Sequence, residues 1–157
     1  MIHQISAEHL TIERIGEIIE KGYKLELSED ARKRIVRCRE YLDKKIEETE
    51  KPIYGVTTGF GSLCNVSIGN DQLSQLQINL MMSHACGTGD RVPNDIVKIM
   101  LLLKIQSLSY GYSGCKLDTV ERLVDFSITM FILLSTCKAH LAHPATLCLW
   151  HTSVCRS

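Results

Sequence analysis

One stretch of the chain, residues 94–111, restricts the possible folds more than any other. It reads "NDIVKIMLLLKIQSLSYG", which has the composition of a helix and is apolar on nearly every side. Pro93, directly before it, suits the first position of a helix. A helix that is apolar all round must be covered on all sides, and a chain of 157 residues provides a single small core. The sequence therefore indicates a piece of a larger protein or an obligate oligomer.

The pattern before this stretch is helical as well. Thr11 is expected to cap a short helix that Gly22 closes, and Ser28 is expected to open a longer helix over residues 29–50. The longer helix carries one apolar stripe on an otherwise charged surface. The stripe is formed by Ala31, Ile35, Cys38, Leu42 and Ile46.

Two further helices complete the expected fold. Asn70 is a suitable cap for a helix over 71–87, and residues 111–126 predict a turn and the start of a fifth helix. Every expected element is helical, and aromatic residues make up only 6% of the chain. We therefore predict an all-α fold class, with a marginal helical core over residues 28–126.

Composition excludes several classes of function. Eighteen basic residues balance eighteen acidic ones, so the chain lacks the charge that binding to nucleic acid or an anionic membrane requires. No apolar run has the length of a membrane span, and the N-terminus lacks a signal-peptide pattern. Seven cysteines occur without a CxxC pair, which fits reduced thiols. We expect a soluble cytoplasmic protein with neither nucleic acid nor membrane as partner.

An uncharged, glycine-rich loop, "IYGVTTGFGSLCN", occupies residues 53–65 between two helical stretches. Its glycines permit positive φ and close backbone packing, so it can be a buried turn. Alternatively, the glycines let the main chain approach a ligand, while Tyr54 supplies a hydroxyl that can act as a general acid or base. The other candidate residues of this loop are Gly55, Thr57, Thr58, Gly59 and Gly61.

A second candidate segment, "MMSHACGTGD", spans residues 81–90. His84 lies on a helix with an apolar face, where a histidine is most often a partly buried side chain with a satisfied hydrogen bond. Alternatively, Ser83 and His84 lie near the end of the helix and can hydrogen-bond a polar ligand ring. Gly87 and Gly89 stop the helix in either case.

Together, these segments resemble a known enzyme family. "YGVTTGFGSLCN", "LQINLMMSHACGTGDRVP" and "MLLLKIQSLSYGYSG" follow one another as in the aromatic amino-acid ammonia-lyases, and the resemblance covers residues 1–126. The Ser83–His84 pair is similar to that of the histidine-specific members of the family. The resemblance implies the N-terminal portion of a mainly helical homotetramer, ahead of its central helix bundle, with sites assembled from several subunits.

The resemblance also implies the reaction, which is the elimination of ammonia from histidine to give urocanate. Tyr54 would then take the β-proton of the substrate, in a loop that overhangs the active site. Ser83 and His84 would lie near the imidazole ring. The family needs a strong electrophile as well, a methylidene-imidazolone that forms from an Ala-Ser-Gly triplet of its own backbone.

That triplet is missing, because the chain changes character after residue 126. Residues 127–157 contain none of the eighteen acidic residues, but they contain three cysteines, three histidines and the only tryptophan. A shift of the reading frame explains this change. Codons for a family-like stretch ending in Gly-Ser-Leu-Gly-Ala-Ser-Gly-Asp, read one base late, encode residues 128–146 of this chain. We therefore expect an ammonia-lyase segment over 1–126 and, over 127–157, a frameshifted tail without a domain of its own.

A metal site in the tail is the alternative explanation of its composition. The candidate ligands have spacings that zinc tolerates, and they are His140, His143, Cys148, His151 and Cys155. The frame shift accounts for each of them without selection for ligands, so we expect no metal.

We thus predict the N-terminal fragment of a histidine-specific ammonia-lyase, inactive by itself because the electrophile is missing. The alternative is a non-enzymatic helical fragment that associates with full-length subunits.

Overall fold

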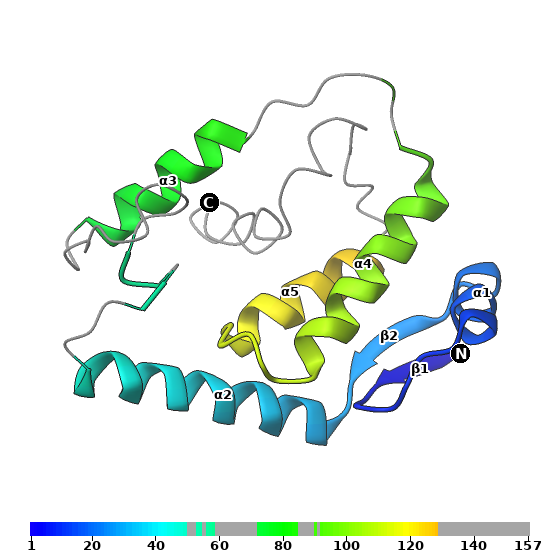
Figure 1. Ribbon diagram of the computed structural model, residues 1–157. Coiled ribbons are helices and arrows are strands. Elements are labelled where there is room, and N and C mark those ends of the chain that lie inside the picture. Colours follow the sequence, from blue (N-terminus) through cyan, green and yellow to red (C-terminus); the bar gives the residue numbers. More distant parts are fainter. Residues whose placement is uncertain (50–52, 55, 59–71, 85–89, 91, 129–157) are drawn as a thin grey trace.

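The structure is a computed structural model that describes residues 1–49, 53, 54, 56–58, 72–84, 90 and 92–128. Figure 1 shows a mainly helical chain, as the sequence predicts. The elements in order are β1 (Ile2–Ile5), α1 (Ile12–Glu20), β2 (Lys24–Leu27), α2 (Glu29–Glu48), α3 (Leu73–His84), α4 (Asn94–Ser109) and α5 (Leu117–Ile128). Residues 129–157 lie outside the described part, so the expected domain boundary at residue 126 stays a prediction.

The expectation that every element is helical is wrong for two short strands. β1 and β2 pair in parallel, with Ile2 opposite Lys24 and Ile5 opposite Leu27. In β2, exposed residues alternate with the buried Leu25 and Leu27, which is the period of a half-buried strand. A strand of four residues contains only two such repeats, which is too few to distinguish it from the helical patterns on either side. The pair is joined by α1, so β1, α1 and β2 form a small β-α-β unit.

The predicted caps of the first two helices are confirmed. The Thr11 side chain accepts a hydrogen bond from the Arg14 backbone N–H, and the Ser28 side chain accepts one from the Ala31 N–H, both at 3.2 Å. Gly22 has a φ of 59°, the left-handed conformation that ends a helix. Pro93 instead occupies the N-cap of α4 and not its first turn, because its ψ of 141° is extended. Asn70 lies outside the described residues.

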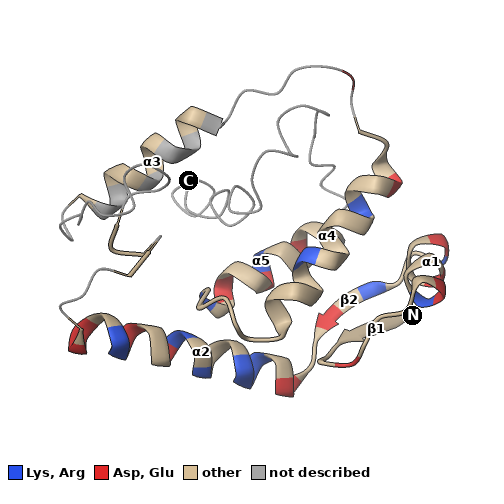
Figure 2. Cartoon of the chain, viewed as in Figure 1, with Lys and Arg blue, Asp and Glu red and all other residues tan. Residues whose placement is uncertain are grey.

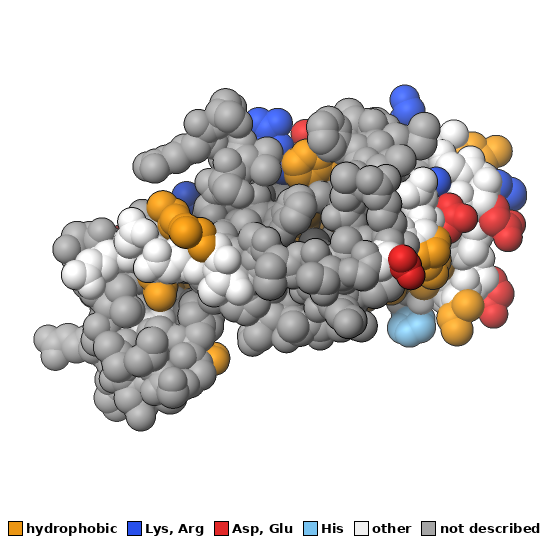
Figure 3. All heavy atoms as spheres, turned by 90° about the horizontal axis from the view of Figure 1, so that it is seen from above, with side chains coloured by type: hydrophobic (Ala, Val, Ile, Leu, Met, Phe, Trp, Pro, Cys, Tyr) orange, Lys and Arg blue, Asp and Glu red, His pale blue; other side chains and the backbone are white. Residues whose placement is uncertain are grey.

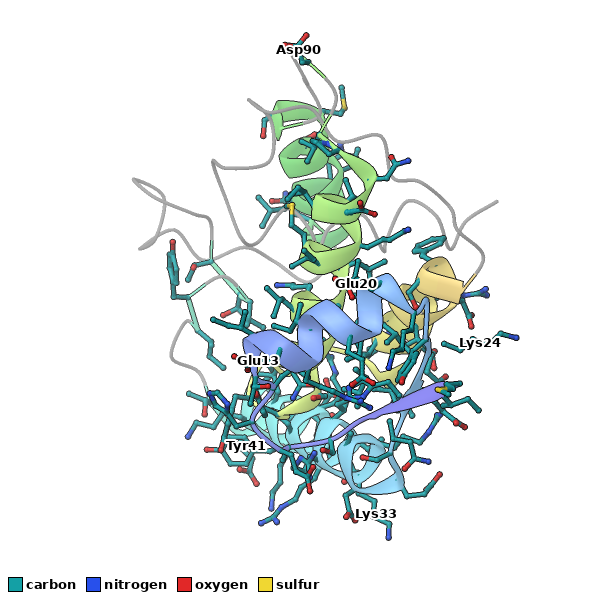
Figure 4. The ribbon with its side chains drawn as sticks, turned by 90° about the vertical axis from the view of Figure 1, so that its right-hand side faces the viewer. Glu13, Glu20, Lys24, Lys33, Tyr41 and Asp90 are labelled. Carbon is teal, nitrogen blue, oxygen red and sulfur yellow. The ribbon has the colours of Figure 1, made fainter. Side chains whose placement is uncertain are left out.

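The core gathers around the C-terminal half of α4. Leu101, Leu102, Ile105 and Leu108 are buried there, against elements that include α5, α2, α1 and β1. Figure 1 shows α4 crossing α5, with α2 below the pair and the β-α-β unit on the right. In Figure 4, Asp90 lies beyond the opposite, N-terminal end of α4, where Asn94, Asp95, Ile96 and Lys98 are exposed.

The core also extends further toward the N-terminus than expected. Ile5, Ile18, Leu25 and Leu27 belong to the same cluster of buried side chains as α4 and α5. The predicted core over 28–126 is therefore wrong at its N-terminal limit, because it omitted the β-α-β unit. The stripe on α2 is oriented as predicted: Ala31 and Ile35 are buried, whereas Figure 2 shows Lys, Arg, Asp and Glu along the rest of this helix.

Candidate functional site

The described part of the glycine-rich loop is a turn that residue 57 closes. The backbone N–H groups of Val56 and Thr57 both donate to the Ile53 carbonyl oxygen at 3.0 Å. In return, the Ile53 N–H donates to the Thr57 side-chain hydroxyl oxygen at 2.9 Å. Thr57 thereby binds both backbone polar groups of Ile53, the residue directly before Tyr54. Turn closure of this kind removes conformational freedom from the enclosed residues.

Side chains of this turn differ in exposure. Tyr54 is 61% exposed, whereas Thr58 is 1% exposed and has its polar side chain inside the molecule. The turn is therefore anchored at Thr58 and presents the Tyr54 ring outward. Gly55, Gly59 and Gly61 lie outside the described residues.

Residues 81–84 of the second candidate segment form the C-terminal end of α3, and residues 85–87, over which the predicted helix continued, lie outside the described part. Ser83 is exposed, and His84 is the last residue of the helix; its side chain is not among those described. Gly87 and Gly89 also lie outside the described part. Figure 1 places α3 and the turn on the same side of the molecule, to the left of α4 and α5. Both candidate segments thus lie apart from the core around α4.

Charged groups with shifted pKa values lie elsewhere, in the β-α-β unit. Hydrogen bonds from Lys21, Arg14 and Tyr23 lower the pKa of Glu17 to about 2. Partial burial lowers the pKa of His3, and the nearby Arg14 adds to this effect. The Arg14 guanidinium also lies over the Tyr23 ring, 5.2 Å from its centre. These contacts join α1 to the strands, and we assign this cluster to stability.

A pocket of about 450 Å³ that the sequence did not indicate lies between β2 and α5. Arg32 and Glu121 form an ion pair in its wall. The remaining lining residues are Ile2, Lys24, Leu25, Glu26, Leu27, Val124 and Asp125. The alternation of apolar and charged residues in β2 was the one sequence signal that could have indicated this pocket. Charges of both signs surround the pocket, and the arginine is already paired, so its walls do not form a binding site for one charged ligand.

The described residues contain neither a membrane-spanning helix nor a cluster of metal ligands. None of the described helices combines the length and apolar character needed to cross a membrane. Within the same residues, no group of three or more His, Cys, Asp or Glu side chains could hold a metal ion. The five tail residues considered as zinc ligands, from His140 to Cys155, lie outside that part of the chain.

Comparison with known sequences identifies related proteins. A sequence model of the family described as aromatic amino acid lyase matches residues 10–131. A histidine ammonia-lyase of Streptococcus gordonii is 44% identical over 127 residues, which make up 80% of this chain and 25% of that protein. One from Deinococcus radiodurans is 47% identical over 115 residues, 73% of this chain and 22% of that protein. The chain thus spans about a quarter of the length of the curated relatives it matches.

Solved structures share the architecture. Histidine ammonia-lyase from Trypanosoma cruzi matches with a TM-score of 0.69 and 30% identity, over 81% of this chain and 24% of that one. Tyrosine aminomutase from Streptomyces globisporus matches with a TM-score of 0.73 and 26% identity, over 81% of this chain and 24% of the other. Since a lyase and an aminomutase have this region in common, the fold alone does not decide the reaction.

Proposed function

Since the chain belongs to the aromatic amino acid lyase family, we propose that it is the N-terminal portion of a histidine ammonia-lyase, an enzyme that converts histidine to urocanate and ammonia. The observation that carries this proposal is the identity of 44% to a protein of that name over 127 residues. The Ser83–His84 pair supports histidine as the substrate, because the imidazole ring needs polar partners.

Elimination of ammonia defines what the active site must supply. One Cα–N bond and one Cβ–H bond break, a Cα=Cβ double bond forms, and the β-proton must pass to a base. We assign this proton to the Tyr54 oxygen, which can accept it after its own hydroxyl proton has been lost. The exposed position of Tyr54 on a closed turn supports this assignment. Ser83 and His84 are assigned to the ring end of the substrate.

The electrophile of the family does not fit this chain. A methylidene-imidazolone forms from an Ala-Ser-Gly triplet, and no such triplet occurs in the 157 residues. No step through that group is therefore assigned to this chain. We propose that the chain as it stands has no lyase activity, and that the frame shift after residue 126 removed the triplet.

Restoring the reading frame after residue 126 tests the proposal. The restored enzyme should form urocanate from histidine, which is followed by ultraviolet absorbance. In it, Tyr54→Phe should lower kcat by about 10² to 10⁴, the usual loss when a positioned acid or base is removed. Tyr41→Phe is the matched control, because Tyr41 on α2 is exposed to a similar degree, 68% against 61%. Equal kcat values in the two variants would remove Tyr54 from the mechanism.

A second candidate function is association without catalysis. On α4, Ile96 and Leu103 are 47% and 44% exposed, and removal of exposed apolar surface from water drives subunit association. Under this alternative, the chain binds full-length subunits of a homotetrameric, cytoplasmic enzyme. Mixing the chain with an intact homologue and separating the complexes by size distinguishes the two, since co-assembly supports association and its absence contradicts it.

A further inference from the structure

The Thr57 side chain takes part in closing the turn around Tyr54. The Thr57 hydroxyl oxygen accepts from the Ile53 N–H at 2.9 Å, and the Thr57 N–H donates to the Ile53 carbonyl at 3.0 Å. Both backbone polar groups of Ile53, the residue before Tyr54, are therefore bound to Thr57. The second of these bonds is made by the backbone, and any residue could form it. The first requires a short side chain with an acceptor oxygen.

We propose that Thr57 is a positioning residue, which sets the orientation of Tyr54 for proton transfer. This inference rests on the proposed function of Tyr54. Tyr54 lies between Ile53 and Thr57, the two residues that the hydrogen bonds join, so the position of its Cα atom depends on how this turn is closed. Thr57 closes the turn by its hydrogen bonds to Ile53, and Thr58, the next residue along the chain, is buried.

The chemistry explains why a small change in this turn matters. A proton passes efficiently only when donor and acceptor lie within hydrogen-bond reach, and misplacement by about 1 Å can reduce a rate by about 10²-fold. Loss of the Thr57 hydroxyl should therefore reduce the rate of the chemical step, while the binding of the substrate ring at Ser83 and His84 is retained.

The first experiment uses the frame-restored enzyme. Thr57→Val keeps the shape of the side chain and removes the acceptor, so kcat should fall by about 10- to 100-fold with little change in KM. Thr57→Ser keeps the acceptor and should retain kcat close to that of the unmodified enzyme. Unchanged kcat in Thr57→Val, or an equal loss in Thr57→Ser, would overturn the proposal.

A double variant separates positioning from general support of the fold. If Thr57 acts through Tyr54, then Tyr54→Phe with Thr57→Val should be no slower than Tyr54→Phe alone, because the positioned hydroxyl is already absent. A further loss in the double variant would contradict positioning. Failure of Thr57→Val to assemble, while Thr57→Ser assembles, would also overturn it, because Thr57 would then be structural.

A second experiment uses the chain as it stands and does not depend on activity. Exchange of the Ile53 amide hydrogen, measured by nuclear magnetic resonance, should be faster in Thr57→Val than in the unmodified chain and in Thr57→Ser. Equal exchange in all three would contradict the hydrogen bond itself. Faster exchange together with the lower kcat of Thr57→Val supports the inference. If exchange is faster but the restored enzyme does not act on histidine, then the proposed function is wrong and the hydrogen bond is not.

Discussion

Gly111, in the turn between α4 and α5, shows how strictly one residue can be specified. Its φ of 76° is left-handed, and a Cβ atom there would lie 2.8 Å from the Arg34 carbonyl oxygen. Both the conformation and the contact exclude a side chain. This turn brings α5 back against α4, so the requirement at one residue determines how two helices of the core meet.

Replacing Gly111 by alanine should therefore destabilise the chain by about 1–3 kcal/mol. Gly16 is the matched control, since it lies inside α1 and a Cβ there would meet nothing within 4 Å. Gly16→Ala should stabilise by about 0.5–1 kcal/mol, because alanine favours the helix. On heating, the midpoint of the loss of helical signal, followed by circular dichroism, should fall in Gly111→Ala and rise in Gly16→Ala. A Gly111→Ala chain as stable as the unmodified one would show that the turn can open without cost.

His84 allows a prediction about selectivity at the residue scale. In the frame-restored enzyme, His84→Leu should lower kcat/KM for histidine, because the imidazole of the substrate would lose a polar partner. The loss of transition-state stabilisation should be about 1–3 kcal/mol. Steady-state kinetics with histidine and tyrosine as competing substrates measure the change. Unchanged preference for histidine would assign His84 a structural role only.

At the scale of elements, one carboxylate adds a polar link within the β-α-β unit. Glu17 on α1 accepts hydrogen bonds from Lys21 at 2.8 Å and from the Tyr23 hydroxyl at 3.0 Å. Figure 4 shows α1 lying across the unit, with Glu13 and Glu20 toward its opposite ends. Since Tyr23 directly precedes β2, the carboxylate joins the helix to the strand, and its charge state affects how firmly they are held.

The lowered pKa of Glu17 predicts a specific acid sensitivity. Its folded pKa of about 2 lies below the ordinary value of 4.5. The ionised Glu17 carboxylate therefore contributes fully to the free energy of unfolding above pH 4.5, and this contribution is lost as the pH falls toward 2. Glu17→Gln should remove this part of the pH dependence, so its stability should fall less steeply between pH 4.5 and 2. Acid titrations followed by circular dichroism test this, with Glu20→Gln as the control; equal slopes in Glu17→Gln and the unmodified chain would contradict it.

At the scale of the whole molecule, apolar surface remains exposed. Ile78 and Met82 on α3 are exposed, as are Ile96 and Leu103 on α4. Figure 3 shows hydrophobic side chains at the end of the molecule that carries α3. The curated relatives are about four times as long as the matched segment.

We therefore predict that the purified chain associates and melts without a sharp transition. Apolar surface left uncovered drives association, and the core around α4 is small. Size-exclusion chromatography and a thermal melt measure both properties. Ile96→Glu with Leu103→Glu should reduce association, whereas Tyr112→Glu, at an exposed position in the turn after α4, should not. A soluble monomer with a cooperative transition would contradict the prediction.

The sequence by itself determined the features that depend on neighbouring residues. Thr11 and Ser28 cap helices because each side chain reaches a backbone N–H three residues ahead. The apolar stripe on α2 was readable because a helix repeats its faces every three or four residues. The family was readable in the same way, because its motifs at Tyr54 and His84 are continuous stretches of sequence.

Tertiary structure alone decided the features that join distant segments. The pairing of Ile2 with Lys24, the burial of one half of α4, and the ion pair between Arg32 and Glu121 each depend on residues far apart in the chain. No local period encodes such contacts, because closing a long loop is favourable only when many other contacts form with it. Four-residue strands and a half-covered helix therefore become visible only once the chain has folded.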